Sequence, residues 1–185
     1  YISDATGETE LYMQPAEGGQ AVQLTKNNDT YIRDFEWSPD SKWFVTSYVA
    51  RDHAPYSDIG IVSAEGGKPI HNITNTGYFD TNPRWALDGN AIIFASERFG
   101  MRNHASWGSQ SDVMAIFLNR KAYDEYRMNE EEYELYSAQN KKAEKPEEKK
   151  DDKKKKDKKK TEEVKSKDIV IEWDNIEDRI VRLTP

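Results

Sequence analysis

The chain has 185 residues, enough for one domain with a sizeable core. Charge is unevenly placed: residues 141–168 hold 14 of the 27 Lys and Arg residues and 9 of the 34 Asp and Glu residues, a balance of +5. The rest of the chain carries −12, which gives the overall −7. Nucleic-acid-binding surfaces neutralise phosphates with clustered Lys and Arg, so an acidic body argues against this class and no nucleic-acid partner is expected.

The sequence contains no cysteine, which excludes disulfides, thiol catalysis and cysteine-ligated metals. No apolar run approaches the ~20 residues that a membrane-spanning helix needs, so no membrane span is expected. The chain opens at Tyr1 without an initiator Met, and its first residues read as the end of a strand. We expect it to be a piece of a longer protein.

The first 74 residues read as short strands separated by turns. In the hairpin over 35–45, Phe35 and Trp37 alternate with polar residues, Pro39-Asp40-Ser41 has turn chemistry, and 43–45 is aromatic and β-branched. Other short strands are expected at 2–3, 10–13, 20–25, 58–62 and 69–74.

The hairpin has an echo 48 residues later, where Trp85 stands opposite Trp37 and Asp88-Gly89 stands opposite Asp40-Ser41. Further matching pairs are the Gly-Gly turns at 18–19 and 66–67, and Leu24-Thr25 with Ile73-Thr74. A repeat of this size, built from short strands and turns, is typical of a β-propeller blade.

A third unit begins at Trp85 and is interrupted. Strands at 91–96 and 112–118 precede a helical stretch over 119–142 in two pieces, the second with a capping box formed by Asn129 and Glu132. Residues 141–167 are Lys/Glu/Asp-rich with almost no apolar side chain, and are expected to stay mobile. Strand character returns at 169–173, and Leu183-Thr184 ends the unit as Leu24-Thr25 ends the first.

We therefore predict an all-β protein of four-stranded antiparallel propeller blades in an incomplete ring. Residues 1–25 are expected to be the end of a blade and 26–74 a complete blade. Residues 75–185 are expected to be a blade interrupted by an insertion at 119–168, helical over 120–142 and flexible over 141–168. The tyrosines of the insertion are expected to pack on the body: Tyr123, Tyr126, Tyr133 and Tyr136.

The repeated residues resemble the TolB-type propeller repeat, which is shared by TolB, prolyl-oligopeptidase relatives and tricorn-type peptidases. The resemblance rests on 37–41 and 85–89, with the Gly-Gly turns and the terminal Leu-Thr, and covers most of 1–118. Ala86-Leu87 departs from it, because the repeat has Ser-Pro at this place.

A narrower resemblance lies on both sides of the insertion. Residues 117–123 and 176–184, with the Glu-rich helix and the Lys-rich stretch between them, look like the propeller region of bacterial tricorn-like serine peptidases. In that family the catalytic Ser and His lie in peptidase parts that follow the propellers. No position here matches those motifs, so no catalytic residue is carried over, and neither a metal nor another cofactor is expected.

This resemblance implies a non-catalytic propeller segment of a hydrolase, which guides or filters peptides toward a peptidase core outside the chain. The alternative is a TolB-like protein-interaction propeller with no enzymatic activity. The implied partners are peptide substrates or proteins, the remaining blades and peptidase domains of the parent chain, and further copies in an oligomer. The implied location is periplasmic or otherwise extracytoplasmic, with the cytoplasm left open.

The histidines offer the one alternative with metal chemistry. His53 and His104 both fall in loops between second and third strands, where Asp52, Asp58 or Asp112 could supply a third ligand. Solvated loop histidines are the simpler interpretation, and His71 in a strand is interpreted as structural. Trp37 and Trp85 are interpreted as packing between blades rather than as stacking sites for a ligand. The Lys-rich stretch could tether an acidic partner or surface.

Overall fold

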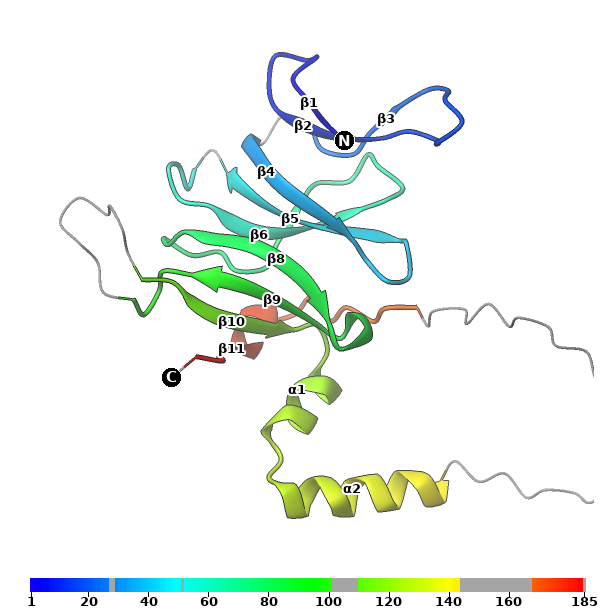
Figure 1. Cartoon of the computed structure of the whole chain (residues 1–185), viewed down its shortest axis with the longest axis vertical. Coiled ribbons are helices and arrows are strands. Elements are labelled where there is room, and N and C mark those ends of the chain that lie inside the picture. Colours follow the sequence, from blue (N-terminus) through cyan, green and yellow to red (C-terminus); the bar gives the residue numbers. More distant parts are fainter. Residues whose placement is uncertain (27–28, 51, 101–109, 144–167, 185) are drawn as a thin grey trace, which may run out of the picture.

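The computed structural model describes residues 1–26, 29–50, 52–100, 110–143 and 168–184. Their strands form three antiparallel sheets, stacked one on the next (Figure 1). The first sheet contains β1 (Ile2–Ser3), β2 (Glu10–Met13) and β3 (Val22–Gln23). The second contains β4 (Asp29–Trp37), β5 (Trp43–Ala50), β6 (Asp58–Ser63) and β7 (His71–Asn72). The third contains β8 (Asp80–Ala86), β9 (Ala91–Ser96), β10 (Asp112–Phe117) and β11 (Ile180–Arg182).

The second and third sheets are copies of one four-stranded meander, in which each strand pairs with the next along the chain. Trp37 pairs with Phe44 across β4 and β5, and Trp85 pairs with Ile92 across β8 and β9. The two tryptophans therefore occupy the same register position. The predicted fold class, antiparallel propeller blades without a closed ring, is confirmed, and we call the three sheets the first, second and third blades.

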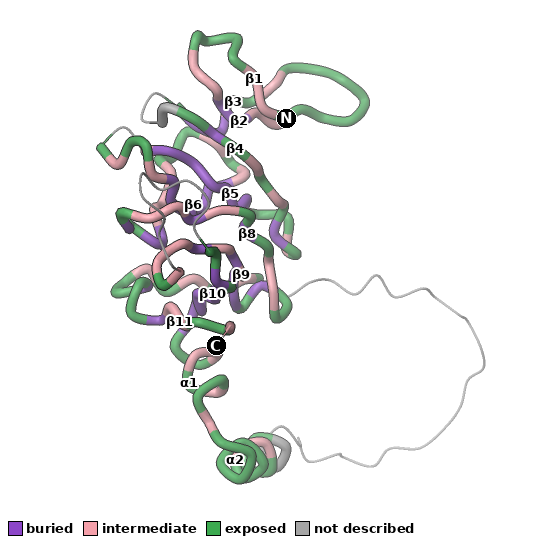
Figure 2. Tube along the Cα trace, turned by 60° about the vertical axis from the view of Figure 1, so that its left-hand side comes forward, coloured by how far each residue is buried: buried purple, intermediate pink, exposed green. Residues whose placement is uncertain are grey.

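The main core lies between the second and third blades, and a smaller one lies between the first and second (Figure 2). Every residue of β6 is buried, because this strand is covered on both faces by its neighbours. The main core contains the following buried residues: Val45, Ile59, Ile61, Ile73, Ile92, Phe94, Met114, Ile116, Leu118 and Ile176.

The insertion lies inside the third blade, since β10 pairs with β11 although more than 60 residues separate them in the chain. It contains α1 (Arg120–Arg127) and α2 (Glu130–Ala143), which project away from the sheets (Figure 1). The predicted capping box is present: Glu132 N–H donates to Asn129 Oδ1 at 2.9 Å and Asn129 N–H to Glu132 Oε2 at 3.0 Å. The expectation of a mobile Lys-rich stretch falls almost entirely on 144–167, outside the described residues.

The strand expected over 169–173 is wrong, because no strand pairs there and the chain continues into a 3₁₀ turn, η3 (Ile176–Arg179). Arg179 is buried and its guanidinium donates to the carbonyls of Glu172, Asp174 and Asn175. These three carbonyls thus accept hydrogen bonds from a side chain instead of from a neighbouring strand. We call residues 168–175 the return segment.

The expected packing of all four tyrosines is also wrong. Tyr123 and Tyr126 contact the Phe117 ring at centroid distances of 5.8 and 4.9 Å, but Tyr133 on α2 is 51% exposed. Most of α2 is exposed along its length (Figure 2). Tyr133 and Leu135 are two residues apart, so they lie on different sides of α2 and cannot both face the blades, and both are more than half exposed. No described helix is long and apolar enough to cross a bilayer.

Candidate functional site

An acidic residue and a threonine join the third and fourth strands of each blade. The acid is the first residue of the third strand, and the threonine comes after the fourth. In the second blade, Thr74 Oγ1 donates to Asp58 Oδ1 at 3.3 Å and accepts from Ile59 N–H at 3.0 Å. The hydroxyl thus satisfies both the carboxylate and a backbone donor. We call this arrangement the acid–Thr pair.

The other two blades repeat the pair with small changes. In the first blade Thr25 Oγ1 donates to Glu10 Oε2, and both side chains are fully buried. In the third, Thr184 Oγ1 donates to Asp112 Oδ1 at 2.9 Å. There the Arg182 guanidinium binds the same carboxylate at 2.7 Å and holds the pKa of Asp112 below its usual range.

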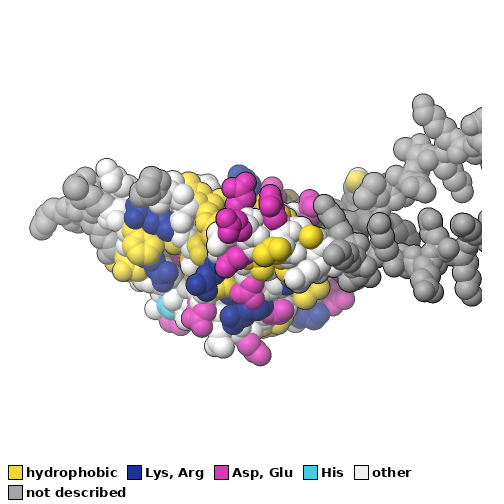
Figure 3. Space-filling view, turned by 90° about the horizontal axis from the view of Figure 1, so that it is seen from below, with side chains coloured by type: hydrophobic (Ala, Val, Ile, Leu, Met, Phe, Trp, Pro, Cys, Tyr) yellow, Lys and Arg dark blue, Asp and Glu magenta, His cyan; other side chains and the backbone are white. Residues whose placement is uncertain are grey.

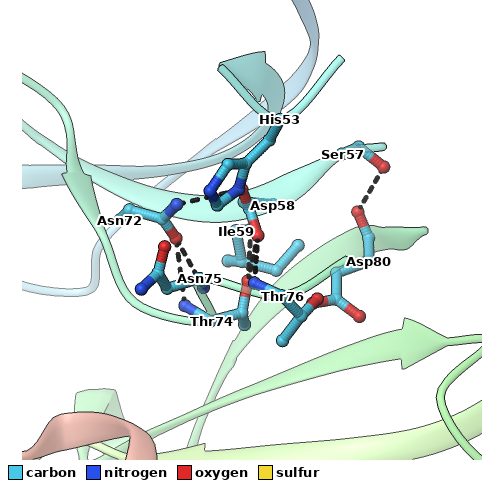
Figure 4. A network of polar contacts seen from close by, with 9 residues as sticks. All are labelled: His53, Ser57, Asp58, Ile59, Asn72, Thr74, Asn75, Thr76 and Asp80. Atoms are coloured by element: carbon cyan, nitrogen blue, oxygen red, sulfur yellow. Dashed lines mark hydrogen bonds and ion pairs between the residues drawn. The ribbon is translucent and has the colours of Figure 1, made fainter. Parts of the chain in front are cut away.

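The second blade extends its pair into a larger polar network (Figure 4). Asp58 is fully buried and accepts hydrogen bonds from Asn72 Nδ2 at 2.9 Å and from Thr76 N–H at 2.8 Å, besides that from Thr74. Asn72 Oδ1 in turn accepts from the backbone of Asn75 at 2.8 Å. A buried carboxylate needs this many donors to replace its lost hydration. The network therefore fixes the connection from the second blade to the third.

A second buried carboxylate, Asp80, continues the network into the third blade. Thr76 Oγ1 donates to Asp80 Oδ2 at 2.9 Å, and Ser57 Oγ donates to the Asp80 carbonyl at 2.9 Å. Asp80 Oδ1 accepts no hydrogen bond from the described residues. Burial, helped by the nearby charge of Asp58, raises the pKa of Asp80 against the opposing effect of surrounding hydroxyls.

His53 lies at the solvent edge of this network, with its side chain 26% exposed. Its Nδ1 is 2.6 Å from Asp58 Oδ2, so the carboxylate holds the ring with Nε2 directed away from Asp58 (Figure 4). The Nε2 atom of such a ring can form a hydrogen bond with a polar group of a ligand. Asp58 itself has no lone pair to spare, because four donors already surround it.

The proposed metal site stays unsupported in the part of the chain that the structure describes. His53 and Asp58 do come together, but no three acidic or histidine side chains there could hold a metal. His104 lies outside the described residues. His71 instead stacks on the Trp173 ring at 4.3 Å, a packing contact.

Sequence reasoning noted the repeated threonines but missed their acidic partners. The available signal was an acid followed by a hydrophobic residue at each third strand: Glu10-Leu11, Asp58-Ile59 and Asp112-Val113. The roles of Asn72, Thr76 and Asp80 follow from tertiary contacts and had no local signal beyond the polar stretch after β7.

No family model matches the chain, and no curated protein matches it. Among solved structures, the tricorn protease is similar with a TM-score of 0.54 and 13% identity, over 94% of this chain and 15% of that one. A protein described as a putative TolB from Agrobacterium tumefaciens has a TM-score of 0.48 and 19% identity, over 64% of this chain and 40% of that one. The chain thus spans less than half the length of either protein. The likeness to the tricorn protease, with the repeated sheets, shows that this chain has the fold of β-propeller blades.

Proposed function

We propose that the chain is the non-catalytic propeller segment of a tricorn-like serine peptidase, and that it guides or filters peptides toward a peptidase core outside this sequence. One spatial observation supports the proposal. The two segments that resemble the tricorn-like family, 117–123 and 176–184, meet in the structure: Arg179 Nε donates to the Phe117 carbonyl at 2.9 Å. The two segments lie immediately before and after the insertion in the chain, and they contact each other in the third blade.

The buried polar network of the second blade presents the His53 side chain to solvent, where it could contact a peptide. His53 lies in the loop between β5 and β6, at one end of the blades. The return segment contacts Asp40, in the turn between β4 and β5 at the opposite end. A fixed imidazole beside buried polar groups can bind the backbone amides of a passing peptide without reacting with them. In this proposal the protein works outside the cytoplasm, as an oligomer, with the other blades and peptidase domains of its parent chain.

The experiment compares peptides of increasing length as substrates of the complete protein that contains this chain. We expect hydrolysis of all of them, with His53→Ala raising KM for long peptides while kcat for the shortest stays unchanged. The matched control is His71→Ala, because His71 packs on Trp173 instead of facing the loop end. A complete protein without peptidase activity, or equal effects of both variants on all lengths, contradicts the proposal.

The alternative is a TolB-like interaction propeller without an enzyme, and one surface favours it. Tyr126, Tyr133 and Leu87 are exposed and line a 350 Å³ groove between α1, α2 and the third blade. At this end of the molecule, charged side chains of both signs lie around exposed hydrophobic ones (Figure 3). Exposed apolar patches with polar rims are typical of protein-binding surfaces. Loss of binding partners, without loss of any hydrolysis, on Tyr133→Ala would favour this second function.

A further inference from the structure

Two buried carboxylates lie on either side of Ser96 in one row across the third blade. Ser96 is opposite Asp80 in the β8–β9 register and opposite Asp112 in the β9–β10 register. Directly opposed residues of neighbouring strands point to the same face of a sheet, so the three side chains share one face. Each carboxylate is buried and has one oxygen, Asp80 Oδ1 or Asp112 Oδ2, without a hydrogen-bond partner among the described residues.

Asp112 has an arginine as its counter-ion. Arg182 Nη2 lies 2.7 Å from Asp112 Oδ1, and the same guanidinium lies over the Phe99 ring at 5.5 Å from its centroid. One arginine thus neutralises a buried acid and contacts an exposed aromatic ring at the same time. We call this arrangement the acid–arginine–aromatic unit.

Asp80 has the same components nearby, but they are not joined. Arg98 follows Ser96 by two residues, and its backbone N–H donates to Ser96 Oγ at 3.2 Å. The Arg98 guanidinium lies over the Tyr78 ring at 5.9 Å and makes no ion pair with a described residue. Arg98 and Asp80 nevertheless line one pocket, whose other lining residues are Thr76, Phe94, Ser96, Met114 and Ile180.

Asp80 Oδ1 cannot obtain its missing donor from water in this arrangement. Less than 1 Å² of this oxygen is exposed, and the pocket has no room for a water molecule. Burial raises the pKa of Asp80, and the Ser96 and Thr76 hydroxyls oppose this effect without outweighing it. An ionised Asp80 therefore needs a further donor. Arg98 is the one other charged side chain among the described residues that line the pocket.

We propose that Arg98 is a latch for Asp80: when the carboxylate ionises, the guanidinium leaves the Tyr78 ring, enters the pocket and binds Asp80 Oδ1. The closed latch is a second acid–arginine–aromatic unit with its arginine moved from the ring to the acid. When Asp80 is protonated, Arg98 stays on Tyr78. Closing ties the segment after β9 to the connection between the second and third blades. The inference does not depend on the role in peptide handling proposed above.

The neighbouring charges set the direction of the switch. Asp58 at the start of β6 repels an ionised Asp80, and His53 contacts Asp58 in turn. Asp112 on β10 is paired with Arg182 on β11, so these two add little net charge. Burial and Asp58 thus oppose ionisation of Asp80, while Arg98 favours it. The latch closes as pH rises through the pKa of Asp80 and opens as pH falls through it.

The experiment follows the side-chain carboxyl carbons of the whole 185-residue protein by NMR as pH is raised. The Asp80 resonance is identified by its absence from the spectrum of Asp80→Asn. We expect Arg98→Gln to raise the pKa of Asp80 by about one pH unit or more, because a paired cation lowers the pKa of a carboxyl by about 1–3 units. Arg98→Lys keeps the charge and should raise it less. In the wild type, the Tyr78 ring resonances should change with the same midpoint as the Asp80 carboxyl.

Arg84→Gln is the matched control. Arg84 is an exposed arginine on the same strand as Asp80, and its guanidinium donates to the Pro83 carbonyl, so its replacement should leave the pKa of Asp80 unchanged. Amide spectra verify that every variant folds.

Three results would overturn the proposal. The first is a pKa of Asp80 that is the same in the wild type and Arg98→Gln, or that shifts equally in Arg98→Gln and Arg84→Gln. The second is a set of Tyr78 resonances that do not follow the Asp80 titration. The third is a shift of the Asp112 carboxyl in place of Asp80, because Arg98 would then serve the other acid.

Discussion

The backbone N–H of Ile169 donates to Asp40 Oδ2 at 2.9 Å, which joins the return segment to a turn 129 residues earlier. The preceding residue, Asp168, makes an ion pair with Lys42 at 2.7 Å. Burial raises the pKa of Asp40, but hydrogen bonds from Ser38, Ile169 and Lys42 together outweigh this effect, so the pKa lies below its ordinary value. The insertion in the third blade is therefore anchored on the second blade as well, at the turn between β4 and β5.

Gly89 should be the most sensitive glycine in this anchorage. Its φ is +86°, and an added Cβ would lie 2.4 Å from Ile169 Cδ1. Gly67 is the matched control, with φ of +70° and open space around it. We expect Gly67→Ala to lower the free energy of unfolding by about 1 kcal/mol through backbone strain alone, and Gly89→Ala by about 2–4 kcal/mol. Urea titration measures both, and equal losses would show that the Ile169 contact does not matter.

Replacing Arg179 by lysine should destabilise the fold. The Arg179 guanidinium is buried and donates to several carbonyls in different directions, including Phe117 O at 2.9 Å. A lysine ammonium cannot reach them together, so Arg179→Lys should cost about 2–4 kcal/mol of unfolding free energy. Arg182→Lys is the control, since its ion pair with Asp112 is partly exposed and should cost less than about 1 kcal/mol. Similar losses for both would contradict the assigned role of Arg179.

Replacing Leu87 by asparagine should stabilise the folded protein. Leu87 is 61% exposed and has a φ of +51°, a left-handed conformation that costs a leucine about 1–2 kcal/mol. Because asparagine adopts this conformation more readily, Leu87→Asn should raise the free energy of unfolding by about 0.5–1 kcal/mol. Leu135→Asn on α2 is the control, which should be neutral or destabilising because asparagine is the poorer helix former. A lower melting temperature for Leu87→Asn would contradict the expectation.

Asp80 should make stability depend on pH. Its pKa is raised in the folded protein, so its contribution to stability is complete below the unfolded value of about 3.9 and is lost as pH rises through the folded value. Asp80→Asn removes this loss, so its stability relative to wild type should increase between pH 4 and neutral pH. Asp124→Asn, at an exposed position on α1, is the control. A pH-independent difference between Asp80→Asn and wild type would show that burial of the charge is not the cause.

The repeated fold could be predicted because its signals are local. The spacing of Trp37 and Trp85 indicated equivalent strands, and Asn129 with Glu132 indicated the start of a helix; both predictions are confirmed. The return segment could not be predicted in this way. The alternation of Ile169, Ile171 and Trp173 is typical of a strand. In the structure these side chains pack against the main core although the segment pairs with no strand.

The candidate site was predicted less completely for the same reason. A threonine after each fourth strand is visible in the sequence, whereas its acidic partner lies 15 residues away in the first blade and 72 in the third. The cover on Trp85 likewise comes from Glu36 on β4, 49 residues away in the chain, and not from the residues around it. Local patterns indicate which side chains can pack, but the neighbour that covers them is a property of the assembled sheets.

The outermost strands β3, β7 and β11 contain only two, two and three residues. An edge this short offers few free backbone groups to a strand from another molecule, and the acid–Thr pairs hold it by side chains instead. Growth of fibrils by edge-to-edge pairing on the outer rim is therefore disfavoured. The outer edge of the described blades is thus a poor template for pairing with a strand of another molecule, in contrast to β4 and β8, which lie at the other edge of their sheets and contain nine and seven residues.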